Sequence, residues 1–290
     1  MMKPLIVITG PTASGKTAYS VEMAQKIGGE IINADSMQIY KHMDIGTAKP
    51  SMEERGGIPH HLMDIVEPWE NYSVAQYCKE AHRCIAQIHD SGKIPILVGG
   101  TGLYIDSVVY NIEYGEGGAD EEFRREMKQL ASERGNEYIL NMLEKVDPQS
   151  AAKIHLSDTK RIIRALEVYH LTGETITEQN KKSRLKKSPY DAKIYAIEME
   201  RQELYRRINA RVDMMFEAGL TDEVKRLLGM GVSEKATSMQ AIGYKETAEY
   251  LRGEASFSDA VEKIKRNTRR YAKRQLVWFR RNSGINWVRR

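Results

Sequence analysis

Short, wholly apolar runs alternate along the first third of the chain with longer stretches in which apolar residues recur at helical spacing. Two such runs, at 5–9 and 94–98, are typical of strands buried on both faces of a parallel sheet, and a further strand is expected at 30–34. Helical spacing predicts one helix at about 17–27 and another from 73 to the glycine at 92. Strands that alternate with helices, and that end in polar turns, predict an open α/β sheet.

The pattern changes near Tyr114. A glycine-rich segment, 115–118, looks like a hinge, and charged, helical sequence follows it. Helices are expected at 120–134, 136–146, 158–172 and 175–182, a strand at 193–199, and helices from Arg201 to the end, the last of them basic and amphipathic at about 258–282. We therefore predict three segments: a first part of the α/β core at 1–114, a helical insertion at 115–190, and a return to the core with basic C-terminal helices at 191–290.

Composition indicates a globular protein, because 41% of the 290 residues are hydrophobic and 29% are charged. The apolar run that follows Met1 is too short for a signal peptide or a spanning helix, so we expect a cytoplasmic protein that does not enter a membrane. Cys78 and Cys84 are six residues apart on one expected helix and predict neither a disulfide nor a metal site. The His60–His61 pair has no third ligand at helical spacing.

Positive charge is unevenly distributed, although the formal net charge is only +4. Residues 263–290 contain eleven Lys or Arg and no Asp or Glu, and residues 181–187 are basic at five of seven positions. A single exposed lysine is most often only solvated, but clusters of one sign indicate a phosphate-rich partner.

One motif carries a specific chemistry. It fits G-x-x-x-x-G-K-[ST] between an expected strand and an expected helix, and consists of Gly10, Pro11, Thr12, Ala13, Ser14, Gly15, Lys16 and Thr17. Backbone N–H groups of such a loop bind phosphates, Lys16 neutralises a terminal phosphate, and the Thr17 hydroxyl can be a ligand to Mg²⁺. The motif predicts a P-loop NTPase-like parallel sheet flanked by helices, with the helical insertion added to it.

The P-loop alone does not identify the group that is transferred. Taken by itself, it would most simply be interpreted as part of a small-molecule kinase. Asp35 ends the second expected strand and would lie near the P-loop if the two strands were neighbours; alternatively, it caps the next turn. Thr101, between glycines after the strand at 94–98, could bind a substrate or simply form a turn.

Six segments, spread in order over nearly the whole chain, give a more specific resemblance. They are GPTASGKT at 10–17, DSMQIY at 35–40, PHHLMDI at 59–65, GGTGLY at 99–104, KRIIRALEVY at 160–169 and TRRYAKRQLVWFR at 268–280. Together they resemble the bacterial tRNA dimethylallyltransferase family. Agreement is weaker in the helical stretch 115–155.

The resemblance implies transfer of the dimethylallyl group from dimethylallyl diphosphate to the exocyclic amine of the adenosine immediately 3′ of the anticodon in tRNA. Asp35 would accept the amine proton, Thr101 would bind the amine or the diphosphate, and Lys16 with Mg²⁺ on Thr17 would stabilise the leaving diphosphate. Arg207 and Arg211, one helical turn apart, resemble the diphosphate clamp of the family, and the sequence does not decide between them.

The resemblance also implies a tRNA-binding surface. Its expected residues are Asp35, Ser36, Met37, Gln38 and Thr101 around the target base, and Lys160, Arg161, Ile162, Ile163 and Arg164 in the insertion. The enzyme is expected to act as a monomer. Two other classes compete with this reading: a P-loop kinase or adenylate isopentenyltransferase acting on free nucleotides, and an RNA-binding protein without chemistry. The insertion and the basic C-terminus argue against the former, and Asp35 beside a complete P-loop argues against the latter.

Overall fold

The computed structural model describes residues 2–112, 118–185 and 188–289, with the side chains of 183–185 left aside. The chain divides into two compact units, one formed by Met1–Val109 with Pro189–Arg290 and the other by Tyr110–Ser188. Each is described separately. The expected hinge at 115–118 lies outside the described residues except for Gly118.

The first unit is built on a parallel sheet whose strands have the order β3-β2-β4-β1-β5-β6. Their bounds are β1 Lys3–Thr9, β2 Gly29–Asn33, β3 His60–His61, β4 Ile94–Val98, β5 Tyr190–Glu198 and β6 Asn286–Arg289. The expected strands are confirmed as β1, β2, β4 and β5, whereas β3 and β6 were not predicted. The expectation of helices from Arg201 to the end is wrong at β6, which extends the sheet edge beside β5.

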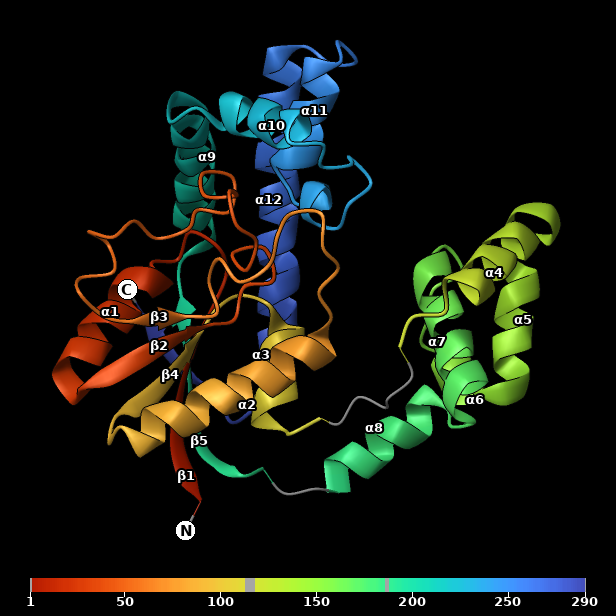
Figure 1. Cartoon of the computed structure of the whole chain (residues 1–290), viewed down its shortest axis with the longest axis horizontal. Helices are drawn as coiled ribbons and strands as arrows, with labels where there is room; N and C mark the ends of the chain where they lie inside the picture. Colours follow the sequence, from red (N-terminus) through yellow and green to blue (C-terminus); the bar gives the residue numbers. More distant parts are fainter. Residues whose placement is uncertain (1, 113–117, 186–187, 290) are drawn as a thin grey trace. The chain divides into compact units, whose positions relative to one another are not determined.

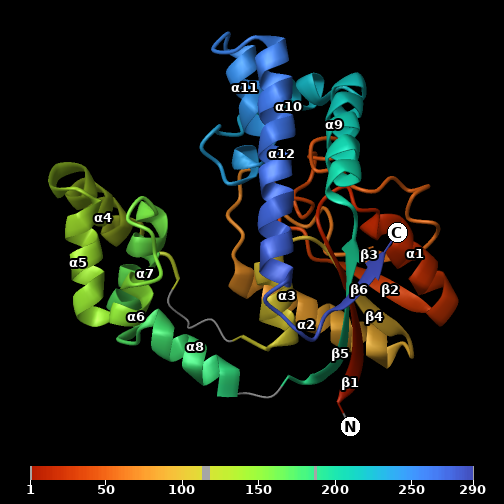
Figure 2. The same cartoon turned by 180° about the vertical axis from the view of Figure 1, so that it is seen from behind.

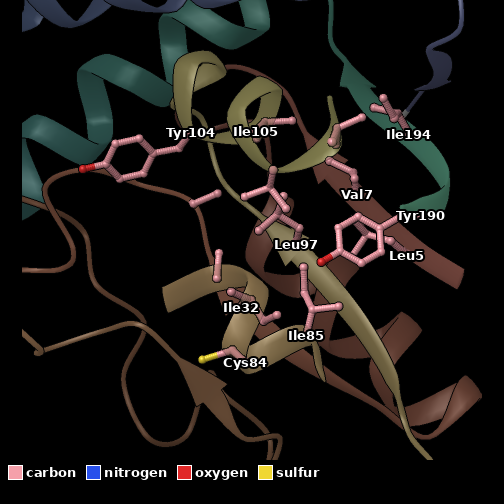
Figure 3. Packing of buried hydrophobic residues seen from close by; sticks show 14 of the residues in the cluster. Leu5, Val7, Ile32, Cys84, Ile85, Leu97, Tyr104, Ile105, Tyr190 and Ile194 are labelled. Carbon is pink, nitrogen blue, oxygen red and sulfur yellow. The ribbon is translucent and has the colours of Figure 1, made fainter. Parts of the chain in front are cut away.

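Side chains alternate across the sheet and bury both of its faces. Leu5, Val7, Ile32 and Leu97 pack against α2 (Val74–Asp90) and α3 (Gly102–Val109), as Figure 3 shows for the residues that it labels. Ile8, Ile31 and Ile96 pack on the other face against α1 (Lys16–Ile27). Burial on both faces explains why these strands are continuous apolar runs in the sequence.

Local signals explain where these helices begin and end. Ser73 caps α2 in a capping box with Gln76, whose backbone N–H donates to the serine hydroxyl. Gly28 ends α1 in the left-handed conformation, with φ at 67°. Both boundaries agree with the sequence prediction.

The remaining helices of the first unit come from the C-terminal third of the chain. They are α9 (Arg201–Glu217), α10 (Leu220–Gly229), α11 (Tyr244–Leu251) and α12 (Phe257–Phe279). Figures 1 and 2 show the long helix α12 running beside α9 and α11. Ala272 of α12 and Leu204 and Ile208 of α9 pack against Ala13 of the P-loop, so the basic last helix reaches the site from its buried face.

The second unit is helical. It contains α4 (Glu121–Arg134), α5 (Asn136–Val146), α6 (Pro148–Ala151), α7 (Thr159–Thr172) and α8 (Ile176–Leu185). Ile139, Leu143 and Ile162 are fully buried in its own core. The four helices expected here correspond to α4, α5, α7 and α8, and α6 was missed. No described helix of either unit is long and apolar enough to cross a membrane.

Candidate active site

A cavity of about 1120 Å³ opens at the carboxyl edge of the sheet in the first unit. The segment that follows β1 forms the P-loop, Asp35 follows β2 by two residues, and Gly99 follows β4. β1 and β2 are not neighbours, because β4 lies between them. The condition under which Asp35 was expected to lie near the P-loop is therefore wrong, yet both line this cavity, since all parallel strands end at the same edge.

The P-loop has the backbone form that an anion site requires. Gly10, Ala13 and Gly15 have positive φ values of 138°, 62° and 87°, and backbone of this kind is what allows a loop to line an anion site with N–H groups. Ser14 is 1% exposed, and its hydroxyl has no hydrogen-bond partner within the described residues. An unsatisfied buried hydroxyl in such a loop suits a ligand oxygen.

Lys16 lies in this loop with its Nζ 2.7 Å from the carbonyl oxygen of Pro11, to which it donates. Burial lowers the pKa of Lys16 to about 8; the charge of Asp35 opposes this shift and that of Arg211 adds to it. Burial disfavours the charged form of Lys16. An anionic ligand in the loop would stabilise that form and restore the ordinary protonation of the lysine.

Asp35 is oriented by its own backbone. Its N–H donates to the side-chain oxygen of Asn33 at 3.0 Å, and its Oδ1 accepts from the N–H of Met37 at 2.9 Å. Burial raises the pKa of Asp35 above its ordinary value, although the Met37 N–H and the charge of Lys16 act against the shift. A carboxylate with a raised pKa is a stronger base than an exposed one.

Thr101 lies beside Asp35 in a network. Its hydroxyl oxygen accepts from the N–H of Ser36 at 3.0 Å, and its side chain is hydrogen-bonded to Tyr271. Burial raises the pKa of the Tyr271 hydroxyl, and the nearby Asp35 raises it further. Tyr271 lines the cavity and was not singled out from the sequence.

The first two positions after β4 have room only for glycine. A Cβ on Gly99 would lie 2.1 Å from the carbonyl oxygen of Ala34, and one on Gly100 would lie 2.2 Å from the amide nitrogen of Gln275. Gln275, 5% exposed, accepts from the N–H of Thr12 at 2.9 Å and donates to the carbonyl oxygen of Gly100 at 3.0 Å. One side chain of α12 therefore ties the P-loop to the loop that carries Thr101. Its sequence signal is a polar residue one turn after Tyr271 on a helix that is apolar on the same face.

The structure distinguishes the two candidate arginines of α9. Arg211 lines the cavity, and burial lowers its pKa. Arg207 is not among the residues that line it, and its Nε donates to Glu203 at 2.7 Å in an exposed ion pair. Hydrogen bonds from Arg206 and then from Arg207 lower the pKa of Glu203 to about 2. This placement favours Arg211 as the predicted diphosphate clamp. Arg207 was a candidate for this contact as well, but it does not line the cavity.

The predicted tRNA contacts of the insertion lie on α7. Ile162 and Ile163 are 0% and 3% exposed in the core of the second unit, so the prediction that these two side chains contact RNA is corrected: they hold α7 in place. Arg164 donates to the fully buried Glu167 at 2.6 Å, whereas Lys160 and Arg161 are exposed. Of the basic cluster 181–187, residues 186 and 187 lie outside the described part.

Metal-ligating groups are sparse. Among the described residues, no three His, Cys, Asp or Glu side chains come together as a metal site. His61 contacts Glu30 at 2.6 Å, and His60 contacts the carbonyl oxygen of Ile58. Mg²⁺ commonly needs only one or two protein ligands when phosphates supply the rest, so Thr17 on the cavity wall fits such an ion better than the histidine pair.

Comparison with known proteins agrees with this geometry. The family model described as IPP transferase matches residues 38–282, and one described as isopentenyl transferase matches residues 3–64. Proteins described as tRNA dimethylallyltransferase, from Carboxydothermus hydrogenoformans and Acetivibrio thermocellus, are 54% and 50% identical over 287 residues; each alignment covers 99% of this chain and 92% of the relative.

Solved structures show the same likeness. A tRNA isopentenylpyrophosphate transferase from Bacillus halodurans is 45% identical with a TM-score of 0.74, covering 99% of this chain and 90% of that one. A eukaryotic dimethylallyltransferase, described as acting on tRNA, is 33% identical with a TM-score of 0.82. The match covers 99% of this chain and 74% of that chain. The fold is thus the P-loop NTPase-like one that the sequence predicted, and the chain belongs to the IPP transferase family, whose members compared here are prenyltransferases that modify tRNA.

Proposed function

We propose that this protein transfers the dimethylallyl group of dimethylallyl diphosphate to the exocyclic amine of the adenosine immediately 3′ of the anticodon in tRNA, releasing diphosphate. One observation carries the proposal: Lys16 of the P-loop and Asp35 line the same cavity and act on each other electrostatically. A cation for the leaving group and a base for the nucleophile are the two groups that this reaction requires.

The P-loop holds the leaving group. As the allylic carbon–oxygen bond breaks, negative charge grows on the diphosphate, and Lys16, the loop N–H groups and the Ser14 hydroxyl stabilise it. Arg211 lines the same wall and adds a planar guanidinium. Mg²⁺, held by the Thr17 hydroxyl and the diphosphate oxygens, would supply further charge neutralisation.

Asp35 serves the nucleophile. The adenine amine is weakly nucleophilic because its lone pair is delocalised, so its proton must leave as the new carbon–nitrogen bond forms. Asp35 accepts that proton, and its raised pKa makes the transfer more favourable. Thr101 is hydrogen-bonded to the N–H of Ser36 and to Tyr271, and Tyr271 lines the cavity that contains Asp35. The target base must leave the stack of the anticodon loop to enter the cavity.

The substrate is tRNA in preference to a free nucleotide. The relatives are described as acting on tRNA, and the helical unit Tyr110–Ser188 is not needed to bind a nucleotide. Lys160 and Arg161 on its surface are suited to phosphate contacts. We further propose that the enzyme acts as a monomer in the cytoplasm.

Incubation of the protein with tRNA, labelled dimethylallyl diphosphate and Mg²⁺ tests the proposal. We expect a nucleoside heavier by one dimethylallyl group and the release of diphosphate, with ATP inhibiting by competition for the P-loop. Lys16→Ala should slow transfer by about a hundredfold while tRNA affinity changes little, because Lys16 contacts the diphosphate alone. A requirement for ATP hydrolysis, or full activity of Lys16→Ala, would contradict the mechanism.

A further inference from the structure

A buried carboxylate outside the cavity holds one of its walls. The side chain of Glu223, on α10, is 1% exposed. Its Oε2 accepts from the backbone N–H groups of Asp44 and Ile45 at 2.9 and 3.0 Å, and its Oε1 accepts from that of Gly46 at 3.1 Å. The hydroxyl of Tyr244, on α11, donates to Oε1 at 2.6 Å. Four donors on one buried carboxylate form a strong, directional anchor.

The anchored segment, 44–48, lines the cavity and has a constrained backbone. A Cβ on Gly46 would lie 2.4 Å from the ring of Tyr244, so the segment packs tightly on the same tyrosine that donates to Glu223. Ala48 has φ at 50°, in the left-handed region that alanine disfavours. Without external support such a backbone would relax, and Glu223 supplies this support.

On its other side, the segment fixes the orientation of Gln38. The side-chain Nε2 of Gln38 donates to the carbonyl oxygens of Thr47 at 3.1 Å and Ala48 at 3.2 Å. Two carbonyl oxygens accept and cannot donate, so the amide of Gln38 has only one favourable orientation. Both of its N–H bonds are used, and within the described residues no donor meets its Oε1. Gln38 lines the cavity together with Asp35, so an acceptor remains for a ligand.

We infer that Glu223 is a positioning residue for RNA recognition: through the segment 44–48 it locks Gln38 as a hydrogen-bond acceptor for the exocyclic amine of an adenine in the tRNA loop. This rests on the proposed function. An acceptor that cannot flip favours a base edge that donates and disfavours one that presents a carbonyl. If Glu223 is changed, the segment relaxes, Gln38 can rotate, and this selection is lost while the diphosphate site remains.

The test uses binding without chemistry. Affinities would be measured, with no donor present, for anticodon stem–loop RNAs in which each loop adenine is singly replaced by purine, which lacks the amine. The wild type should bind one of these RNAs about five- to tenfold more weakly than the parent, as expected for one hydrogen bond. Gln38→Ala and Glu223→Gln should show nearly equal affinity for the two RNAs, and their affinity for the donor, measured separately, should be unchanged. Tyr244→Phe, a milder change, should lose part of the difference.

Glu246→Gln is the matched control. Glu246 is also a buried carboxylate, on α11, but it accepts from the N–H of Gly243 and the side chain of Asn267 and not from the segment 44–48. It should keep the full discrimination. A ratio of two affinities does not depend on the fraction of protein folded, so loss of stability alone leaves it unchanged. Wild-type discrimination in Glu223→Gln and Tyr244→Phe would overturn the inference, whereas a wild type that neither binds nor modifies the RNA would overturn the proposed function.

Discussion

Buried charged groups differ between the core of the helical unit and the cavity of the α/β unit. In the helical unit, Glu167 is fully buried; burial alone would raise its pKa, but hydrogen bonds from Arg164 and Arg124 lower it below the ordinary value. In the α/β unit, burial is the largest influence on Lys16 and Asp35 and prevails, so the pKa of the lysine is lowered and that of the aspartate is raised.

This difference separates structural from functional polar groups. Glu167 has all its partners within the protein and contributes to a single packed arrangement of α4 and α7. Lys16, Asp35 and Ser14 hold charge or hydrogen-bonding capacity that a ligand would satisfy. Perturbed groups in a cavity are therefore the better guide to the active site than the number of ion pairs.

The largest expected effect is at Asp35. Asp35→Asn keeps the size of the side chain but removes its basicity, so kcat should fall by about a hundred- to ten-thousandfold. Affinities for donor and tRNA, measured separately, should change little. Retention of full turnover would mean that another group accepts the amine proton. The raised pKa of Asp35 would then not indicate a catalytic base.

The two arginines of α9 test the difference between a residue that lines the cavity and a surface residue within a single helix. Arg211→Ala should raise the donor KM by about tenfold or more, because a guanidinium on the cavity wall is lost. Arg207→Ala removes only an exposed ion pair with Glu203 and should change the donor KM by less than about twofold. Steady-state kinetics of both variants decide the question, and the opposite ranking would refute the placement of the clamp.

A smaller effect is expected from pH. The lowered pKa of Lys16, about 8, means that the free enzyme loses this charge as pH rises through 8, and the donor KM should rise by up to about tenfold per pH unit above it. Lys16→Arg keeps its charge over this range and should lack the dependence, whatever its absolute affinity. Persistence of the pH dependence in this variant would assign it to a different group.

The smallest effect concerns the helical unit. Arg161, 73% exposed, should contribute one phosphate contact, so Arg161→Ala should reduce the log–log salt slope of tRNA binding by about one unit. Arg125 on α4, also 73% exposed, is the control and should leave the slope unchanged on replacement by alanine. Arg164 is unsuitable for this test, since its loss would leave the buried Glu167 with Arg124 as its remaining charged partner and could destabilise the unit. Equal slopes for wild type and Arg161→Ala would remove this surface from the RNA interface.

Local features were predicted well from the sequence. β1 and β4 are apolar because both sheet faces are covered, and the P-loop and Asp35 begin within two residues of the ends of β1 and β2, so periodicity and motif sufficed. β3 and β6 were missed because two and four residues beside a sheet edge leave little pattern. Whether the strands before the P-loop and Asp35 are neighbours was left open by the sequence, because the strand order depends on the crossovers of the whole sheet.

Long-range contacts could not be predicted. Gln275 meets Thr12 across 263 residues, and Glu223 meets Gly46 across 177, and no local pattern specifies either pair. The choice between Arg207 and Arg211 depends on which face of α9 turns toward the P-loop, and Ile208 and Val212 are buried on that helix as well. Ile162 and Ile163 lie among the apolar positions of a predicted helix, which is typical of core residues. They were nevertheless predicted to contact RNA, because the family resemblance implied it.

The bridge made by Gln275 also constrains the order in which the site can form during translation. The amide that joins the P-loop to the loop after β4 is supplied by residue 275, long after the loops themselves have been synthesised. β1 likewise waits for β5, at 190–198, before both of its edges are paired. A nascent chain that has not yet reached residue 275 therefore carries a P-loop without this bridge.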